Sequence, residues 1–172
     1  FAEALTGPAG AYTEKGLTFH LASSFGFCYG VDRAVDMAYE TKKRFPGRRI
    51  LLTAQIIHNP LVNDNLQKMG IEFFDDYDRV TNEDVVLLPA FGATTLQIDT
   101  LKAKGCLLVD TICGSVLNVW KRVESYAQDG FTSVIHGKHY HEETQATSSR
   151  VLGYSKGKYL IVFNMEEAQY VC

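Results

Sequence analysis

Two pairs of a cysteine and a histidine stand out in this sequence of 172 residues. His58 follows Cys28 after 30 positions, and His141 follows Cys113 after 28. Residues of these types can act as reduced thiols or as metal ligands. The near-equal spacing of the same two residue types predicts an internal repeat that carries a functional site.

The stretch FGFCYGVDRAV, residues 25–35, sets Cys28 at the start of a predicted helix. A cysteine in this place can act as a small buried hydrophobe. A helix start also stabilises a thiolate, through unpaired backbone N–H groups and the positive end of the helix dipole. This stretch alone leaves both interpretations open.

The elements around each pair follow one order: cysteine, helix, strand, histidine. In the first copy an apolar stripe predicts a helix over 29–44, the strand RRILLTA follows, and His58 lies in the loop after it. In the second copy a strand in GCLLVDTICGSV leads to Cys113, a helix follows, and FTSVIHGKHYHEE supplies a strand and the loop with His141. A helix near 62–69 and the short apolar runs EFFDD, DVVLLPA and KYLIVF complete a pattern of parallel strands and covering helices.

The predicted fold class is therefore α/β, with repeated parallel-sheet units at 28–112 and 113–172 after an N-terminal segment, 1–27. Open sheets of this class form clefts outside the carboxyl ends of their strands. We expect each cysteine at a strand end that opens into a helix. Glu143 follows His141 by two residues, so in an extended loop the two side chains should point to the same side. One face would then collect the side chains of both copies: Cys28, Cys113, His58, His141 and Glu143.

Composition and charge indicate an ordinary globular protein. Hydrophobic residues make up 46%, and 17 basic against 20 acidic side chains give a net charge of -3, which argues against a broad nucleic-acid-binding surface. No apolar run approaches a membrane span and no signal-peptide pattern is present, so we expect a soluble protein without a nucleic-acid or membrane partner. Because the sequence begins at Phe1 and ends at Cys172 without a helix stop, we expect a processed product or a fragment.

The other cysteines and several rings have simpler interpretations. Four cysteines are too few and too scattered for a disulfide framework, and we expect Cys106 and Cys172 to pack or to have no role. Trp120, Tyr126 and Phe131 fall at core spacing and are expected to pack. The stretch GKHYHEE offers a zinc alternative, although it lacks the helical spacing H-E-x-x-H. The residues of that alternative are His136, His139, His141 and Glu143.

Four ordered motifs make the sequence resemble a known family, 4-hydroxy-3-methylbut-2-enyl diphosphate reductase, the last enzyme of the non-mevalonate isoprenoid pathway. GFCYGVDRAV is similar to its first cysteine motif, IIHNP to its first histidine motif and VDTIC to its second cysteine motif. IHGKHYHEET resembles its histidine and glutamate motif in the form found in plastids and photosynthetic bacteria. The resemblance runs in order from about Leu17 to Cys172 and covers nearly the whole chain.

The resemblance implies three α/β units around a pseudo-threefold axis, each giving one cysteine to a central [4Fe-4S] cluster. Cys28 and Cys113 would then be cluster ligands. His58 and His141 would contact the substrate diphosphate, and Glu143 would deliver a proton to the departing hydroxyl. The family reduces 4-hydroxy-3-methylbut-2-enyl diphosphate with two electrons and two protons to isopentenyl and dimethylallyl diphosphates. Ferredoxin or flavodoxin as electron donor, and a bacterial cytoplasm or a plastid stroma as compartment, are further implications.

The sequence departs from the family's pattern in several places. Ala54 and Gln55 replace a glycine and a glutamate before the first histidine. Gly114 replaces the proline after the second cysteine, and Phe91 stands where some members carry another phosphate-binding histidine. The chain stops before the third cysteine and the serine and asparagine motifs, so the third unit is absent and Cys172 is not its substitute. The alternative function is a non-catalytic α/β module that binds a phosphorylated small molecule.

Overall fold

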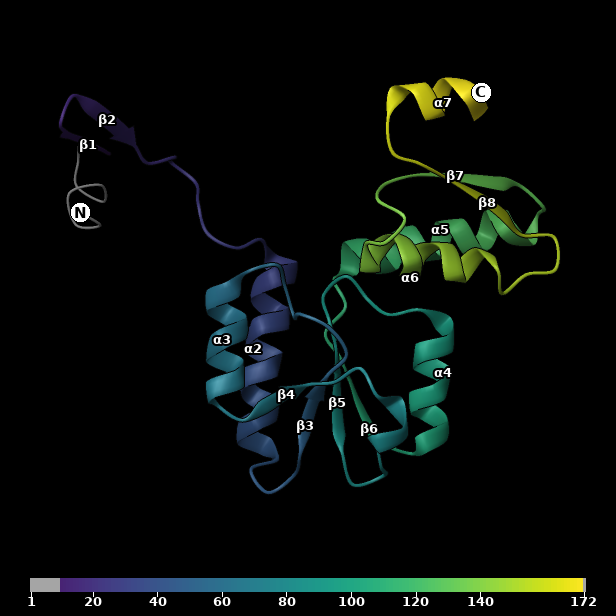
Figure 1. Ribbon diagram of the computed structural model, residues 1–172, viewed down its shortest axis with the longest axis horizontal. Helices are drawn as coiled ribbons and strands as arrows, with labels where there is room; N and C mark the ends of the chain where they lie inside the picture. Colours follow the sequence, from purple (N-terminus) through teal and green to yellow (C-terminus); the bar gives the residue numbers. More distant parts are fainter. Residues whose placement is uncertain (1–9, 172) are drawn as a thin grey trace.

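The computed structural model describes residues 10–171, and in this part of the chain parallel strands alternate with helices (Figure 1). The central sheet holds four parallel strands in the order β4-β3-β5-β6. A second parallel pair, β7 and β8, is separate from it, and β1 and β2 form an antiparallel hairpin. The strands are β1 Ala11–Glu14, β2 Leu17–His20, β3 Ile50–Leu52, β4 Ile71–Phe73, β5 Val85–Leu88, β6 Leu107–Asp110, β7 Thr132–His136 and β8 Lys158–Val162.

Several helices begin at clear local signals. Pro60 takes the first position of α3, where the Asn59 side chain accepts a hydrogen bond from the Val62 N–H. A capping box between Thr94 and Gln97 opens α4. The helices are α2 Tyr29–Arg44, α3 Pro60–Lys68, α4 Thr95–Lys104, α5 Gly114–Gln128, α6 Glu142–Val151 and α7 Met165–Val171, with a short 3-10 helix, η1, at Tyr77–Arg79.

Helices cover both faces of the central sheet, with α2 and α3 on one side and α4 on the other (Figure 1). Because side chains alternate along a strand, Ile50 and Leu52 of β3 pack against Ala34 of α2, while Leu51 belongs to the opposite core layer with Trp120 of α5. Strands that are buried on both faces have continuous runs of apolar residues. This explains the short apolar runs in the sequence, such as DVVLLPA.

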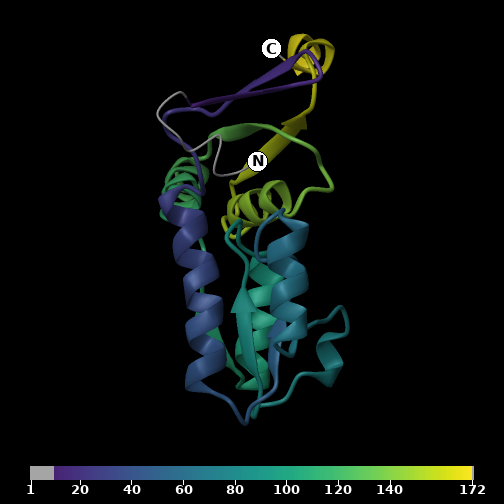
Figure 2. The same ribbon diagram turned by 90° about the vertical axis from the view of Figure 1, so that its left-hand side faces the viewer.

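The second part of the molecule lies beyond the carboxyl ends of the central strands. Figures 1 and 2 both place α5, α6 and the β7–β8 pair at that edge of the sheet. Since parallel strands share this edge, the loops that follow β3, β5 and β6 all reach toward α5 and α6. The fold therefore gathers segments of both sequence copies at one place.

The expectations from sequence hold for the class and most elements. The α/β class with parallel sheets is confirmed, and the order cysteine, helix, strand, histidine is present in both copies. Trp120 and Cys106 are buried as expected, with the Cys106 thiol donating to the Leu101 carbonyl at 3.3 Å. The expectation that Tyr126 and Phe131 pack in a core is wrong. The two rings contact each other edge-on and are 56% and 60% exposed, because nothing in the described residues covers this side of α5 and β7.

The N-terminal hairpin was not anticipated from the sequence. It stands apart from the body in Figure 1 and reaches α2 through an irregular segment, 21–28. Its β2 strand is exposed along its whole length. The proposed unit boundaries at 28–112 and 113–172 remain predictions, and Cys172 lies outside the described residues.

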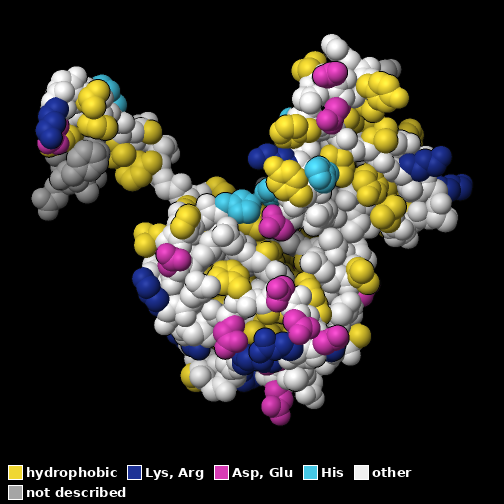
Figure 3. Space-filling model, viewed as in Figure 1, with side chains coloured by type: hydrophobic (Ala, Val, Ile, Leu, Met, Phe, Trp, Pro, Cys, Tyr) yellow, Lys and Arg dark blue, Asp and Glu magenta, His cyan; other side chains and the backbone are white. Residues whose placement is uncertain are grey.

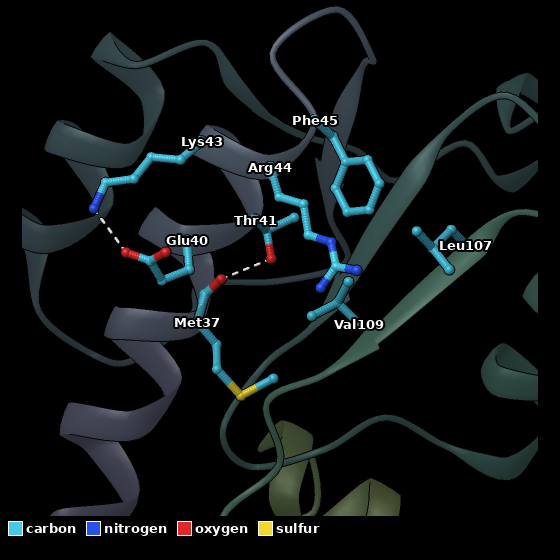
Figure 4. Close-up of a pocket in the computed structure, with 8 residues that line it drawn as sticks. All are labelled: Met37, Glu40, Thr41, Lys43, Arg44, Phe45, Leu107 and Val109. Carbon is cyan, nitrogen blue, oxygen red and sulfur yellow. Dashed lines mark hydrogen bonds and ion pairs between the residues drawn. The ribbon is translucent and has the colours of Figure 1, made fainter.

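An apolar groove lies between the C-terminal half of α2 and the edge strand β6 (Figure 4). Met37, Phe45 and Leu107 line it, and an ion pair between Lys43 and Glu40 lies beside it at 2.7 Å. The groove is at the opposite end of α2 from its first turn and takes no part in the candidate site. No helix among residues 10–171 has both the length and the apolar character required to cross a membrane.

Candidate functional site

The two cysteines of the sequence repeat occupy equivalent positions at helix starts. Cys28 is the N-cap residue of α2 and Cys113 is the N-cap residue of α5, each with an extended backbone. Neither side chain makes a capping hydrogen bond, and both thiols are free. Each thiol therefore lies beside the unpaired backbone N–H groups of a helix start.

The starts of the two helices lie directly against each other. A Cβ atom added to Gly30 would overlap the Cys113 sulfur and lie 3.2 Å from its Cβ, so a side chain at this point of α2 would have to displace Cys113. The Arg33 guanidinium donates to the Ile112 carbonyl at 3.3 Å, and the Cys113 N–H donates to the Ala90 carbonyl at 2.8 Å. The Gly30 contact and the Arg33 bond hold the start of α2 beside Cys113, while the bond to Ala90 ties Cys113 to the loop after β5.

One detail of the expected geometry is wrong. Cys113 follows the sheet strand β6 closely, as expected, but Cys28 does not follow a strand of the central sheet. The nearest preceding strand, β2, ends at His20 and belongs to the separate hairpin. The glycine-containing segment 21–28 therefore delivers Cys28 to its helix from outside the sheet.

The two histidines also meet. His58 lies in the loop between β3 and α3, and His141 is the N-cap residue of α6. Their Nε2 atoms are 2.9 Å apart, and the ring centroids are 5.0 Å apart in an edge-on arrangement. Phe91, from the loop after β5, stacks on His58 with the centroids 4.5 Å apart and the rings nearly parallel. In Figure 3 histidine side chains gather in the middle of the visible face, beside acidic ones.

Each histidine has a second hydrogen bond through its other ring nitrogen. The backbone N–H of Glu143 donates to Nδ1 of His141 at 3.2 Å. Nδ1 of His58 lies 3.3 Å from Oε1 of Gln55. Both imidazoles are thus held on both sides rather than free to rotate.

Glu143 lies in the first turn of α6, where its side chain is exposed. The expectation that His141 and Glu143 share an extended loop is wrong, because α6 begins at Glu142. Acidic side chains favour a helix start, since the dipole there is positive. The relation between His141 and Glu143 is therefore that of a cap and a first-turn residue.

The segments that hold these site residues match a known protein family. Residues 19–172 match the family model described as LytB protein. The chain belongs to the LytB family. The family resemblance of the sequence motifs is thereby confirmed.

Two relatives of this LytB-family chain carry the same name. A 4-hydroxy-3-methylbut-2-enyl diphosphate reductase from Gloeobacter violaceus is 51% identical over 95% of this chain and 41% of its own length. The protein of that name from a strain of Prochlorococcus marinus is 51% identical over 93% of this chain and 40% of its own length. The chain spans about 40% of the length of these relatives.

Two solved structures are similar to it. The structure of (E)-4-hydroxy-3-methyl-but-2-enyl diphosphate reductase, the terminal enzyme of the non-mevalonate pathway, matches 84% of this chain and 50% of its own, with a TM-score of 0.72 and 27% identity. The E-1-hydroxy-2-methyl-but-2-enyl-4-diphosphate reductase from Plasmodium falciparum matches 86% of this chain and 45% of its own, with a TM-score of 0.78 and 26% identity.

The zinc alternative of the sequence is not assembled in this LytB-family chain. His136 faces the Phe163 carbonyl at 3.3 Å, and His139 contacts the ring of Tyr140. Among the described residues, the group whose ligand atoms come together is a different one, with atoms within 4.8 Å of one another: His58, His141 and Glu142.

A set of contacts that was not predicted from the sequence, here called the brace, joins the elements behind the histidines and consists of Gly92, Trp120 and Arg150. The ring of Trp120 on α5 occupies the space where a side chain at Gly92 would stand, and Gly92 has a φ of +88°. The Arg150 guanidinium of α6 lies 3.8 Å from the Trp120 ring centroid and donates to the Ala93 carbonyl at 3.3 Å. Burial lowers the pKa of Arg150 from its ordinary value. The brace ties α5, α6 and the loop of Phe91 into one unit.

Three residues that contact the site residues could have been noticed in the sequence. Gly30 and Gly92 are glycines beside motif residues, and Gln55 is a departure within the first histidine motif. Nothing in the sequence indicates that Arg33 reaches the backbone before Cys113, because that contact joins residues 79 positions apart.

Proposed function

We propose that this chain is the part of a 4-hydroxy-3-methylbut-2-enyl diphosphate reductase that holds two of its cluster-binding cysteines and part of its diphosphate site. The observation that carries the proposal is the contact between two helix starts, each with a free cysteine at its N-cap position. The first turn of α2 lies against Cys113. Membership of the LytB family and the printed names of the relatives support it.

Cys28 and Cys113 fit an iron–sulfur cluster by the chemistry of their donors. Both are free thiols at helix starts, and neither is committed to a capping bond. Thiolates are the usual ligands of such clusters. They would hold a [4Fe-4S] cluster together with ligands from outside these residues, and the bound cluster would supply the electrons of a reductive dehydroxylation.

His58 and His141 are proposed to bind the diphosphate of the substrate. Two imidazoles whose Nε2 atoms face each other at 2.9 Å can both direct hydrogen bonds to one phosphate oxygen once the direct bond between them opens. Phe91 keeps the His58 ring in its plane by stacking. The N-terminal turn of α6 adds a favourable dipole for an anion.

Glu143 is proposed to give a proton to the departing hydroxyl. Loss of hydroxide is unfavourable near neutral pH, and a carboxyl group within reach can protonate the leaving oxygen as it departs. The same proposal includes ferredoxin or flavodoxin as electron donor. It also includes a bacterial cytoplasm or plastid stroma as compartment, which the cyanobacterial relatives support.

Iron analysis of the full-length protein that contains this chain tests the proposal. After anaerobic reconstitution with iron and sulfide, we expect iron, acid-labile sulfide and visible charge-transfer absorbance in the unsubstituted protein. Cys113→Ser should lose most of all three. Cys106→Ala, which removes a buried thiol away from the helix starts, should retain them. Equal iron content in the Cys113→Ser and unsubstituted proteins, or zinc without sulfide, would contradict the proposal.

A further inference from the structure

Gly30 lies in the first turn of α2 and is buried. Its backbone is helical, and it is not among the glycines with a positive φ. Glycine weakens a helix relative to alanine, so neither the backbone conformation nor the stability of the helix favours it at this point. The reason for a glycine here is therefore the space beside it.

That space is filled by Cys113. The three atoms nearest to a Cβ built on Gly30 all belong to this residue: Sγ would overlap the added atom, while Cβ and Cα would lie 3.2 and 3.8 Å from it. Gly114, the first residue of α5, provides the contrast, because nothing lies within 4 Å of a Cβ built there. The glycines that closely follow the two cysteines thus differ, and the contact with a cysteine side chain belongs to Gly30.

The backbone of Cys113 is held on both sides of its N–H. The N–H itself donates to the Ala90 carbonyl at 2.8 Å, and the preceding carbonyl, that of Ile112, accepts from Arg33 at 3.3 Å. A methyl group at position 30 would therefore displace the movable part of Cys113, which is the sulfur, by rotation about the Cα–Cβ bond to another staggered rotamer. The fold can accommodate this rotation, but the thiol would then point in a different direction.

The turn that contacts this sulfur also begins at the other proposed ligand. Cys28 is the N-cap residue of α2, two positions before Gly30, and it is exposed while Cys113 is half-buried. One helical turn thus carries the first cysteine and contacts the sulfur of the second. It therefore determines how the two thiols are placed relative to each other.

We propose that Gly30 is a positioning residue: the absence of a side chain at this point keeps the Cys113 sulfur in the orientation in which it binds a cluster together with Cys28. This inference rests on the proposed cluster ligation by the two cysteines. Gly30 acts through Cys113 and is not a ligand itself. Groups that orient the ligands of a metal site affect how well the site holds its metal.

Alkylation of the cluster-free, full-length protein that contains this chain tests the position of the sulfur. Iodoacetamide is added, and the rate at each cysteine is followed by mass spectrometry. In Gly30→Ala the rate at Cys113 should rise because its sulfur loses the cover of α2, while the buried Cys106 should react as in the unsubstituted protein. Gly114→Ala is the matched control and should leave the Cys113 rate unchanged. An unchanged rate in Gly30→Ala would overturn the inference.

A double variant covers the case in which Gly30→Ala does not fold. Cys113→Ala removes the sulfur that the new methyl group would overlap, so Gly30→Ala combined with Cys113→Ala should fold. Circular dichroism and thermal unfolding measure this. A double variant that is as poorly folded as Gly30→Ala would show that the sulfur is not the group that excludes a side chain at position 30, and the proposal would be wrong.

Cluster binding is the second measurement. After anaerobic reconstitution, Gly30→Ala should bind less iron and sulfide than the unsubstituted full-length protein, and the EPR spectrum of its reduced cluster should differ because one ligand is displaced. Gly114→Ala should match the unsubstituted protein in both. Full iron content with an unchanged spectrum in Gly30→Ala would contradict the proposal. If the unsubstituted protein binds no cluster, the proposed function fails, whereas the alkylation rates still decide whether Gly30 positions the Cys113 sulfur.

Discussion

Glu143 combines two properties at the start of α6. Its backbone N–H orients His141, while its side chain stays exposed and free for chemistry. A substitution that changes only the side chain therefore separates proton donation from the orientation of the histidine.

Glu143→Gln should lower turnover of the complete reductase by a factor of about 10²–10⁴, the usual contribution of a positioned general acid. The amide keeps the shape of the side chain but cannot release a proton, so iron content and substrate binding should be retained. Steady-state kinetics with an artificial electron donor measures the effect. Glu166→Gln, which makes the same change in the first turn of α7, controls for the helix dipole and should leave turnover unchanged. Near-normal turnover of Glu143→Gln would refute the assignment.

The residues of the candidate site were visible in the sequence, but their bonds were not. Cys28, His58, Cys113 and His141 were selected from type, order and spacing. The bond between the two histidines joins positions 83 residues apart, so only the fold can establish it. The cap role of His141 was missed because histidine is not among the preferred N-cap residues, so the motif was interpreted as a loop.

At the scale of elements, the loop between β5 and α4 depends on one glycine. Gly92 has a positive φ, and the Trp120 ring fills the space of its missing side chain. A residue with a Cβ at this point must strain the backbone and displace the ring that Arg150 also contacts. Phe91, the next residue back, stacks on His58, so the disturbance reaches the site.

Gly92→Ala should lower the free energy of unfolding by roughly 1–3 kcal/mol from backbone strain, with a further loss from the overlap with Trp120. Denaturant unfolding followed by the fluorescence of Trp120, the single tryptophan, measures both the stability and the changed ring environment. Gly105→Ala is the matched control, because Gly105 also has a positive φ but only an ordinary contact, 3.6 Å, to Asn82. Equal losses for the two variants would show that strain alone matters and that Trp120 is not displaced.

A partly buried ion pair ties the entry of β3 to the entry of β5. Asp84 accepts two hydrogen bonds from the Arg49 guanidinium, at 2.8 and 2.7 Å, and one from the Thr81 N–H at 2.7 Å. The bond from Arg49 is the main cause that lowers the pKa of Asp84 from 3.8 to about 2. A carboxyl group with a lowered pKa stabilises the fold above its unfolded pKa and loses this contribution as pH falls toward the folded value.

We therefore expect about 2 kcal/mol of the free energy of unfolding to disappear between about pH 5 and pH 2 through Asp84. Denaturant unfolding at several pH values should show that Asp84→Asn is less stable than the unsubstituted chain at pH 5 and that the gap narrows in acid. Asp78→Asn, at a carboxylate that is 98% exposed, should have little effect at either pH. A gap that is the same at both pH values would mean that the ion pair does not carry the pH dependence.

Two helices, α4 and α6, were not predicted from the sequence, and the physical reason is similar for both. Amphipathic stripes predicted α2 and α5, but α4 buries only Leu101 fully and carries no clear stripe. The buried face of α6 is mostly small and polar, with Thr144, Thr147 and Ser148, and Val151 is its one larger apolar side chain, so it has no apolar stripe to detect. It packs against α5 and α4 through these small side chains and through the Arg150 contact with Trp120.

On the scale of the whole molecule, one face of the β7–β8 pair has no cover among residues 10–171. Val134 of β7, Leu160 of β8 and Phe131 are between 43% and 60% exposed. A two-stranded sheet with an open apolar face is marginally stable on its own. The chain spans about 40% of the length of its relatives, and the proposal gives the cluster two ligands from this chain, Cys28 and Cys113.

The two proposed ligands lead to a prediction for the chain of 172 residues by itself. Two cysteines leave two irons of a four-iron cluster without protein thiolates, so reconstitution should give little or no stable cluster after gel filtration in thiol-free buffer. Added dithiothreitol can occupy the open positions and should raise the iron and sulfide content, and this increase should depend on Cys28 and Cys113. Cys28→Ser and Cys113→Ser should each abolish the increase, whereas Cys106→Ala should not. A stable four-iron cluster without added thiol would contradict the prediction and require a further ligand, for which a Cys172→Ser variant is the direct test.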